Sequence, residues 1–160
     1  MGKNKDRILQ RILIAFLWWA SERIMARRRP RIVAITGSSG KTSMKAAIEA
    51  VLKARYRVKA APGNLNTQIG VPLAILGFNR APGIFLGWLP VIVRAAVRAF
   101  TLVRREDILV LEFASDKPGD IAELARRIGP EVALVTSIGP AHIGRFGSIG
   151  AITKEKLSIC

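Results

Sequence analysis

Short apolar runs alternate with longer stretches of helical periodicity along most of the chain after residue 30. The runs are rich in Ile, Val and Leu and are bounded by Gly, Pro and polar residues, as buried strands of a parallel sheet are. The predicted strands are 32–35, 56–60, 108–113 and 132–136, and the predicted helices are 43–55, 69–76, 91–103, 119–128 and one that begins at Ser148. Strands that alternate with helices predict an α/β fold built on a doubly wound, mostly parallel sheet.

The strongest local signal is the loop after the first of these strands, Gly37-Ser38-Ser39-Gly40-Lys41-Thr42-Ser43. Its two glycines allow a tight turn in which successive N–H groups point at one anion. The lysine can reach the β- and γ-phosphates of a nucleotide, and the threonine hydroxyl can ligate Mg²⁺. The spacing G-x-x-G-K-T is two residues shorter between the glycines than the usual motif. Strand, loop and following helix together predict a P-loop that binds a nucleoside triphosphate.

Residues 1–30 form a basic element of their own, for which the pattern predicts an amphipathic helix over roughly 7–28. The longest apolar run, 12–20, has nine residues, well short of the ~18–20 that span a bilayer. The side chains expected to dominate one broad face are Ile8, Leu9, Ile12, Leu13, Phe16, Leu17 and Trp19. Two interpretations stay open: the helix lies on an anionic lipid surface, or it packs on this domain or a partner domain.

Residues 77–105 form a hydrophobic insertion in which Gly and Pro interrupt a run of Ile, Phe, Leu, Trp and Val. The helix predicted within it carries Arg94 and Arg98, and Arg104 and Arg105 lie just beyond. This stretch is interpreted as a second membrane-surface element, a hydrophobic hairpin against the N-terminal helix, or a purely structural insertion.

The charge balance is strongly basic: 26 Lys and Arg stand against 11 Asp and Glu, a net charge of +15. Such an excess favours anionic partners, which include nucleotides, phosphorylated substrates and an acidic membrane surface. We expect no nucleic-acid partner, because no basic patch is interleaved with aromatic residues. Cys160 is the single cysteine, which excludes an internal disulfide and is typical of the reducing cytoplasm. We therefore expect a cytoplasmic protein, with the inner membrane face as an alternative location.

Three further residues have the chemistry that a nucleotide site needs. Glu112 lies near the carboxyl end of a predicted strand and offers a hard oxygen ligand for Mg²⁺. His142, the single histidine, follows another strand in a Gly- and Pro-bounded loop, and Lys156 lies on the last helix. Each of them taken alone reads as an ordinary solvated or loop residue.

Five segments in order nevertheless resemble the central domain of the Mur ligases, and among them the subtype that joins D-alanyl-D-alanine to a UDP-linked muramoyl tripeptide. The segments are TGSSGKTS (36–43), PGNLNTQIGVPLAIL (62–76), ILVLEFASDKPGDI (108–121), VALVTSIGPAHIGRFGS (132–148) and ITKEKLSI (152–159). The resemblance covers most of residues 31–159 and leaves 77–105 as extra or divergent. It implies an ATP-dependent ligase that activates a carboxylate as an acyl phosphate and then forms an amide.

The resemblance also implies roles for individual residues. Lys41, His142 and Lys156 would be catalytic; Thr42, Glu112, His142 and Lys156 would ligate Mg²⁺, Lys156 as a carbamoylated lysine. Gly37, Ser38, Ser39, Gly40, Lys41, Thr42 and Ser43 would hold ATP, while Asn64, Asn66 and Thr67 would face the phosphate donor and the UDP-linked substrate. Ser137 stands where the family usually has Asn, which weakens contacts in that loop.

The family's N-terminal UDP-sugar domain and C-terminal amine-binding domain have no counterpart in the printed residues. The resemblance therefore implies an N-terminal fragment of a longer ligase, with an incomplete ATP-binding domain over 31–160 and no ligase activity by itself. Two alternatives remain: a folylpolyglutamate or cyanophycin synthetase-like ligase, and a non-catalytic, membrane-peripheral nucleotide-binding module.

Overall fold

A four-stranded sheet, parallel throughout, forms the centre of the computed structural model, which describes residues 2–83, 87–101, 106–141 and 143–160. The strands are β1 (Arg31–Thr36), β2 (Val58–Ala60), β3 (Ile108–Glu112) and β4 (Val132–Val135), in the order β2-β3-β1-β4. Val33 on β1 pairs with Val110 on β3 and with Val132 on β4, so β1 and β3 are the inner strands. The predicted α/β fold with a parallel sheet is confirmed.

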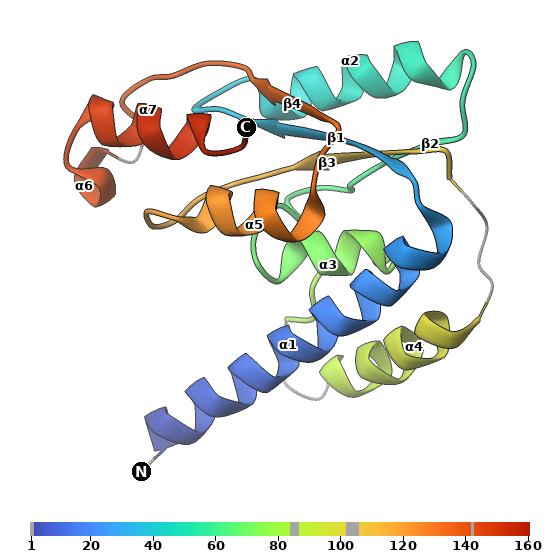
Figure 1. Ribbon diagram of the computed structural model, residues 1–160. Helices are drawn as coiled ribbons and strands as arrows, with labels where there is room; N and C mark the ends of the chain where they lie inside the picture. The colour runs from blue at the N-terminus through green and yellow to red at the C-terminus, as the bar shows by residue number, and fades with distance from the viewer. Residues whose placement is uncertain (1, 84–86, 102–105, 142) are drawn as a thin grey trace.

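Helices cover both faces of this sheet (Figure 1). On one face, Ile48 and Leu52 of α2 (Lys41–Lys53) pack around Ile35 and Val110. The larger core lies on the other face, where α1 (Gly2–Arg28), α3 (Gly70–Ile75), α4 (Trp88–Phe100) and α5 (Asp120–Ile128) gather. Two helices, α6 (Ile143–Phe146) and α7 (Ile149–Leu157), complete the described elements beyond the carboxyl ends of the strands.

The N-terminal helix forms as predicted but presents a different face to the core. Leu17, Trp18 and Ile24 are buried, and Trp18 Nε1 donates to the carbonyl of Gln68 at 3.1 Å. Ile12 and Trp19, expected on the same face as Leu17, are instead exposed. Because residues 12–20 are apolar without interruption, periodicity in this stretch does not select the side that packs. The second half of α1 therefore packs on this domain, as one of the two interpretations proposed, since it contacts α3 and α4.

The predicted starts of β2 and α4 are wrong for local reasons. Strand β2 begins at Val58 rather than at Tyr56, because the Tyr56 N–H still donates to the Leu52 carbonyl at the end of α2. Helix α4 begins at Trp88 rather than at Val91, since a proline at position 90 is tolerated in a first helical turn. Its C-terminal bound is Phe100, and the predicted continuation through 103 falls partly on residues 102–105, which lie outside the described residues. The short helix α6 was not predicted.

Helix α4 lies beside α1, as the hairpin interpretation of residues 77–105 requires (Figure 1). Arg27 on α1 donates to the Ala99 carbonyl at 2.9 Å, and the rings of Trp19 and Phe100 are 6.0 Å apart. Across the described ranges, we find no helix with the length and apolarity needed to cross a membrane.

Candidate functional site

The loop between β1 and α2 makes the predicted tight turn, but its Ser38 and Ser39 N–H groups donate to residue 137 rather than point at an anion site. Gly37 and Gly40 have φ angles of 147° and 80°, which L side chains rarely adopt. Gly40 is the N-cap of α2, and no side chain among the described residues caps this helix. The free N–H groups of the first turn and the positive end of the helix dipole therefore face the space in front of the loop. This arrangement suits a phosphate group.

A second loop, which follows β4, is joined to the phosphate loop by hydrogen bonds. The Ser38 N–H donates to the Ser137 carbonyl at 2.9 Å, and Ser39 N–H donates to Ser137 Oγ at 2.9 Å. A Cβ atom on Gly37 would lie 2.1 Å from Thr136 Oγ1, so only glycine fits this contact. Residue 137 is a serine in this chain, where the resembled family usually has an asparagine. The serine still makes contacts to the phosphate loop.

Glu112 closes the site from the carboxyl end of β3. It is buried, and its carboxylate accepts hydrogen bonds from Asn66 Nδ2 at 2.9 Å and from Thr42 Oγ1 at 3.3 Å. The structure therefore brings together three of the predicted residues, which come from the loop 61–67, from α2 and from β3. The exposed Thr42 and the buried Glu112 link the phosphate loop to the sheet edge.

Lys45 is a member of this group that we did not predict from the sequence. Its Nζ lies 3.4 Å from Glu112 Oε2 and donates to the Gly63 carbonyl at 3.2 Å, and its side chain is only 8% exposed. Lys45 lies one helical turn after Lys41, so spacing along α2 could have placed it at the site. Its ammonium group neutralises a carboxylate whose own side chain is 5% exposed.

Lys41 and Lys156 line a narrow cavity of about 30 Å³ together with Gly37 and Ser38. Lys41 Nζ donates back to the Gly37 carbonyl at 2.8 Å, whereas Lys156 Nζ donates to Ser115 Oγ at 2.9 Å. Burial lowers the pKa of Lys156 below 10.5; the nearby charge of Lys41 lowers it further, and Glu155 partly opposes both. The two lysines therefore face one small space at the phosphate loop.

Glu155 fixes the helix that carries Lys156. Its buried carboxylate accepts from the N–H groups of Gly119 at 2.7 Å and Ile121 at 2.9 Å, which are orphan donors at the start of α5. The neighbouring Asp120 accepts from the N–H groups of Asp116 and Lys117 at 2.9 and 3.0 Å. The two Glu155 contacts hold α7 against the start of α5 and thereby set the position of Lys156.

Other predicted site residues are placed less closely. Ser43 and Asn64 are exposed, and Thr67 Oγ1 accepts from the Gly70 N–H at 3.3 Å, where it supports the start of α3. His142 lies outside the described residues.

The donor set suits a hard divalent cation. Two neighbouring oxygen ligands of Mg²⁺, each about 2.1 Å from the ion, lie about 3 Å from each other. Thr42 Oγ1 and Glu112 Oε2 are 3.3 Å apart, which is close to this separation. No cluster of three or more His, Cys, Asp or Glu side chains exists within the described ranges. A cation there would therefore depend on Thr42, Glu112 and oxygen atoms of a bound nucleotide.

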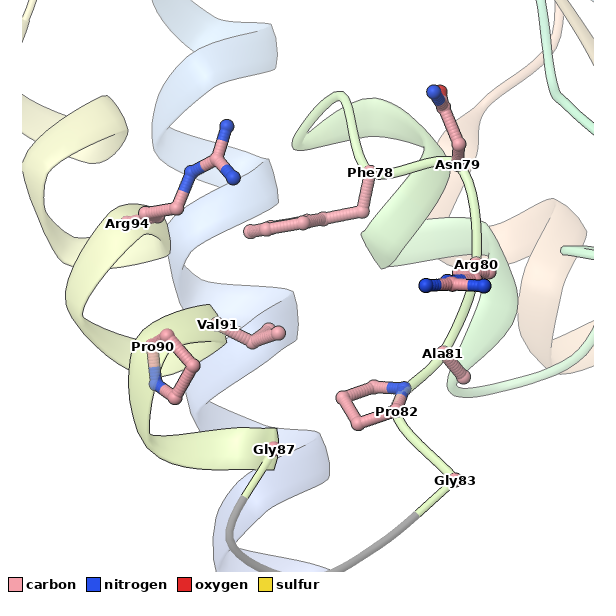
Figure 2. Close-up of a pocket in the computed structure, with 10 residues that line it drawn as sticks. All are labelled: Phe78, Asn79, Arg80, Ala81, Pro82, Gly83, Gly87, Pro90, Val91 and Arg94. Atoms are coloured by element: carbon pink, nitrogen blue, oxygen red, sulfur yellow. The ribbon is translucent and has the colours of Figure 1, made fainter.

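A second hollow, of about 720 Å³, lies elsewhere, between residues 78–83 and the first turns of α4 (Figure 2). Phe78, Val91 and Arg94 border it, and none of its ten lining residues carries a carboxylate. Its described lining therefore offers no carboxylate like that of Glu112.

Comparison with known proteins agrees with this geometry. The sequence matches the family described as Mur ligase middle domain over residues 35–85 and 92–160. Among curated relatives, the UDP-N-acetylmuramoyl-tripeptide–D-alanyl-D-alanine ligase of Treponema pallidum is 35% identical over 127 residues, 79% of this chain and 22% of the relative. The ligase of the same name from Escherichia coli is 32% identical over 138 residues, 86% of this chain and 24% of the relative. The chain thus spans about a quarter or less of these relatives' length.

Solved structures of these ligases share the fold. MurF from Thermotoga maritima, in complex with ADP, has a TM-score of 0.70 and 32% identity, and the match covers 91% of this chain and 29% of that one. MurF from Acinetobacter baumannii has a TM-score of 0.71 and 26% identity, and the match covers 92% of this chain and 27% of that one. With the family match over most of its length, the chain belongs to the Mur ligases, as part of their middle domain.

Proposed function

We propose that this chain is the nucleotide-binding part of an ATP-dependent ligase of peptidoglycan precursor synthesis, which joins D-alanyl-D-alanine to a UDP-N-acetylmuramoyl-tripeptide. The observation that carries the proposal is the linked group Thr42, Glu112 and Asn66 beside an uncapped helix start, within a Mur ligase middle domain. The names of the curated relatives support the substrate pair. ATP and UDP-linked precursors are cytoplasmic compounds, so we place the reaction in the cytoplasm.

In this proposal the phosphate loop and the start of α2 bind the β- and γ-phosphates of ATP. Lys41 turns from the Gly37 carbonyl, its partner at 2.8 Å, toward the γ-phosphate. Ser38 and Ser39 hold the loop in shape through their contacts with residue 137. Because the N–H groups at the start of α2 are held by the helix before the nucleotide arrives, they need little reorganisation when charge develops on the transferred phosphoryl group.

Thr42 and Glu112 would hold one Mg²⁺, and His142 and a carbamoylated Lys156 would serve a second. Bound Mg²⁺ supplies neutralisation of the two anions that must approach each other, the carboxylate and the γ-phosphate. Lys45 lies on the same carboxylate oxygen, Glu112 Oε2. We therefore expect Lys45 to hold Glu112 in place before the cation binds. Lys45 and the cation then share the negative charge of the Glu112 carboxylate.

The reaction has two steps. A terminal carboxylate oxygen of the tripeptide bonds to the γ-phosphorus while the bond from that phosphorus to the bridging oxygen of ADP breaks. The amino nitrogen of D-alanyl-D-alanine then bonds to the acyl carbon, phosphate leaves, and the nitrogen loses a proton. Lys41 neutralises the transferred phosphoryl group in the first step and the departing phosphate in the second.

The test is an assay of amide formation from ATP, UDP-N-acetylmuramoyl-tripeptide and D-alanyl-D-alanine. The assay uses the purified natural protein that contains these residues. We expect one phosphate released per amide formed. Lys41→Ala and Glu112→Gln should each lower the rate by about a hundredfold or more, the usual cost of losing one electrostatic contact to the transition state. Lys53→Ala, on the exposed side of α2, is the control and should keep the rate. Phosphate release that needs neither substrate, or equal rates in all three variants, would refute the proposal.

A further inference from the structure

Helix α4 is apolar on its outer side as well as on its inner side. The inner residues Val91, Ala95 and Ala99 are buried and small. The larger apolar side chains point outward, where Leu89, Val93, Val97 and Phe100 are 54% to 66% exposed. A surface helix of a globular protein normally carries polar residues on that side. The outer side of α4 therefore has the apolar composition of a surface that is buried against another molecule.

Helix α1 extends this apolar surface. The rings of Trp19 and Phe100 lie 6.0 Å apart and join the two helices at their outer edges. Ile8 and Ile12 occupy the same side of α1 as Trp19 by helical spacing, and all three are at least 40% exposed. We call this surface the α1–α4 outer face; it consists of Ile8, Ile12, Trp19, Leu89, Val93, Val97 and Phe100.

The charges around the outer face are nearly all positive. The Arg23 guanidinium lies 4.9 Å from the Phe100 ring centroid and 5.7 Å from that of Trp19. Helix α4 contains two arginines and no acidic residue, and Glu22 on α1 is paired with Arg127 at 3.5 Å. The hollow of Figure 2, which adjoins α4, is lined by a further arginine, Arg80. The exposed arginines of the two helices are Arg7, Arg11, Arg23, Arg27 and Arg94.

We propose that the α1–α4 outer face docks on a lipid bilayer that carries anionic headgroups. Apolar side chains with a tryptophan at the centre and arginines around them match the interfacial region of such a membrane. A second copy of this surface would place like charges opposite each other, which disfavours self-association. The described helices do not cross a membrane, so the contact lies in the plane of the headgroups.

Docking in this orientation leaves the nucleotide site open. Helices α1 and α4 form the outermost layer on the side of the sheet opposite α2, beyond α3 (Figure 1). The loop 37–40 instead leads into α2 and packs on the loop after β4. ATP binding and membrane binding are therefore expected to be independent, and either proposal can fail without the other.

The experiment is flotation of the full chain with vesicles of phosphatidylcholine containing about a third phosphatidylglycerol, against vesicles of phosphatidylcholine alone. We expect binding to the anionic vesicles only, and a decline as salt rises from about 0.05 to 0.5 M. Val97→Glu should lower the partition coefficient at least tenfold. Val51→Glu is the matched control, because Val51 on α2 is the same residue type and is also exposed, at 73% against 54% for Val97, and it should have no effect.

Arg23→Gln tests the charge contribution and should weaken binding about fivefold, whereas Arg55→Gln in the turn after α2 should change it less than twofold. Because these four side chains are all exposed, the variants should fold, and circular dichroism checks this. Equal binding to neutral vesicles, or equal losses with Val51→Glu and Val97→Glu, would overturn the proposal. Sedimentation that shows a dimer broken by Val97→Glu, without vesicle binding, would also overturn it in favour of a second copy.

Discussion

Replacing Lys45 by Met tests whether the buried pair at the sheet edge is built as described. Methionine keeps most of the volume of the lysine stem but removes the ammonium group that lies 3.4 Å from Glu112 Oε2. The carboxylate stays buried and keeps two neutral donors, Asn66 at 2.9 Å and Thr42 at 3.3 Å. The change therefore separates the charge interaction from packing.

The expected cost follows from burial. Loss of one partner of a buried pair costs about 3–5 kcal/mol, and the two remaining hydrogen bonds place this case at the lower end, about 3 kcal/mol. For a chain of this length that corresponds to a fall in Tm of about 6–12 °C. Lys53→Met is the matched control: its partner Glu49 lies at 2.8 Å but the lysine is 56% exposed, so its loss should cost about 0.3–0.5 kcal/mol.

Urea unfolding of Lys45→Met, Glu112→Gln and the double variant measures the coupling directly. We expect a coupling energy of about 2 kcal/mol or more between residues 45 and 112. Addition of Mg²⁺ and ATP should then stabilise Lys45→Met more than the parent chain, because the cation meets no competing ammonium group there. A cost below about 0.5 kcal/mol, with no coupling, would show that the pair does not form in solution.

Three further predictions concern the loop and two charged groups outside it. Gly37→Ala should destabilise the chain by about 2 kcal/mol and weaken nucleotide binding, since the new Cβ would lie 2.1 Å from Thr136 Oγ1; urea unfolding and titration with ATP check this. Burial lowers the pKa of Lys59, so the unfolded chain binds more protons at this residue and the free energy of unfolding should rise as the pH rises toward 10.5. Lys59→Met should remove this rise and should stabilise the chain at pH 7 by about 1 kcal/mol, as measured by urea unfolding. A hydrogen bond from Arg57 lowers the pKa of Asp107 to about 2, so its stabilising contribution is present above pH 3.8 and lost as pH falls through 2; Asp107→Asn should flatten stability across this range in acid titrations followed by circular dichroism.

The sheet and the phosphate loop could be predicted because local signals agree there. A β-branched run, two glycines, Lys-Thr and an alanine-rich helix each favour the same strand–loop–helix unit. The position of Glu112 followed from topology, since the carboxyl ends of parallel strands meet at one edge of the sheet.

Helical spacing gives the side of α2 on which Lys45 lies, but its burial and the packed side of α1 could not be predicted, because both depend on tertiary contacts. A lysine among alanines on a helix reads as solvated, and its burial follows only from the placement of Glu112 and the Gly63 carbonyl around its Nζ. Trp18 and Trp19 differ by 100° around the helix axis, and the apolar pattern places Trp19 on the dominant face although Trp18 is the buried one. The positions of α3 and α4 decide that Trp18 is buried.

The central claim is that the carboxyl edge of this sheet binds a nucleotide together with Mg²⁺. Calorimetric titration of ATP into the 160 residues, with Mg²⁺ and with chelator, tests it most directly. We predict binding that requires Mg²⁺ and weakens by about tenfold or more in Lys41→Ala and in Glu112→Gln, while Lys53→Ala matches the parent chain. Equal ATP affinity in the folded Lys41→Ala variant and the parent, or affinity that is the same with and without Mg²⁺, would contradict the account.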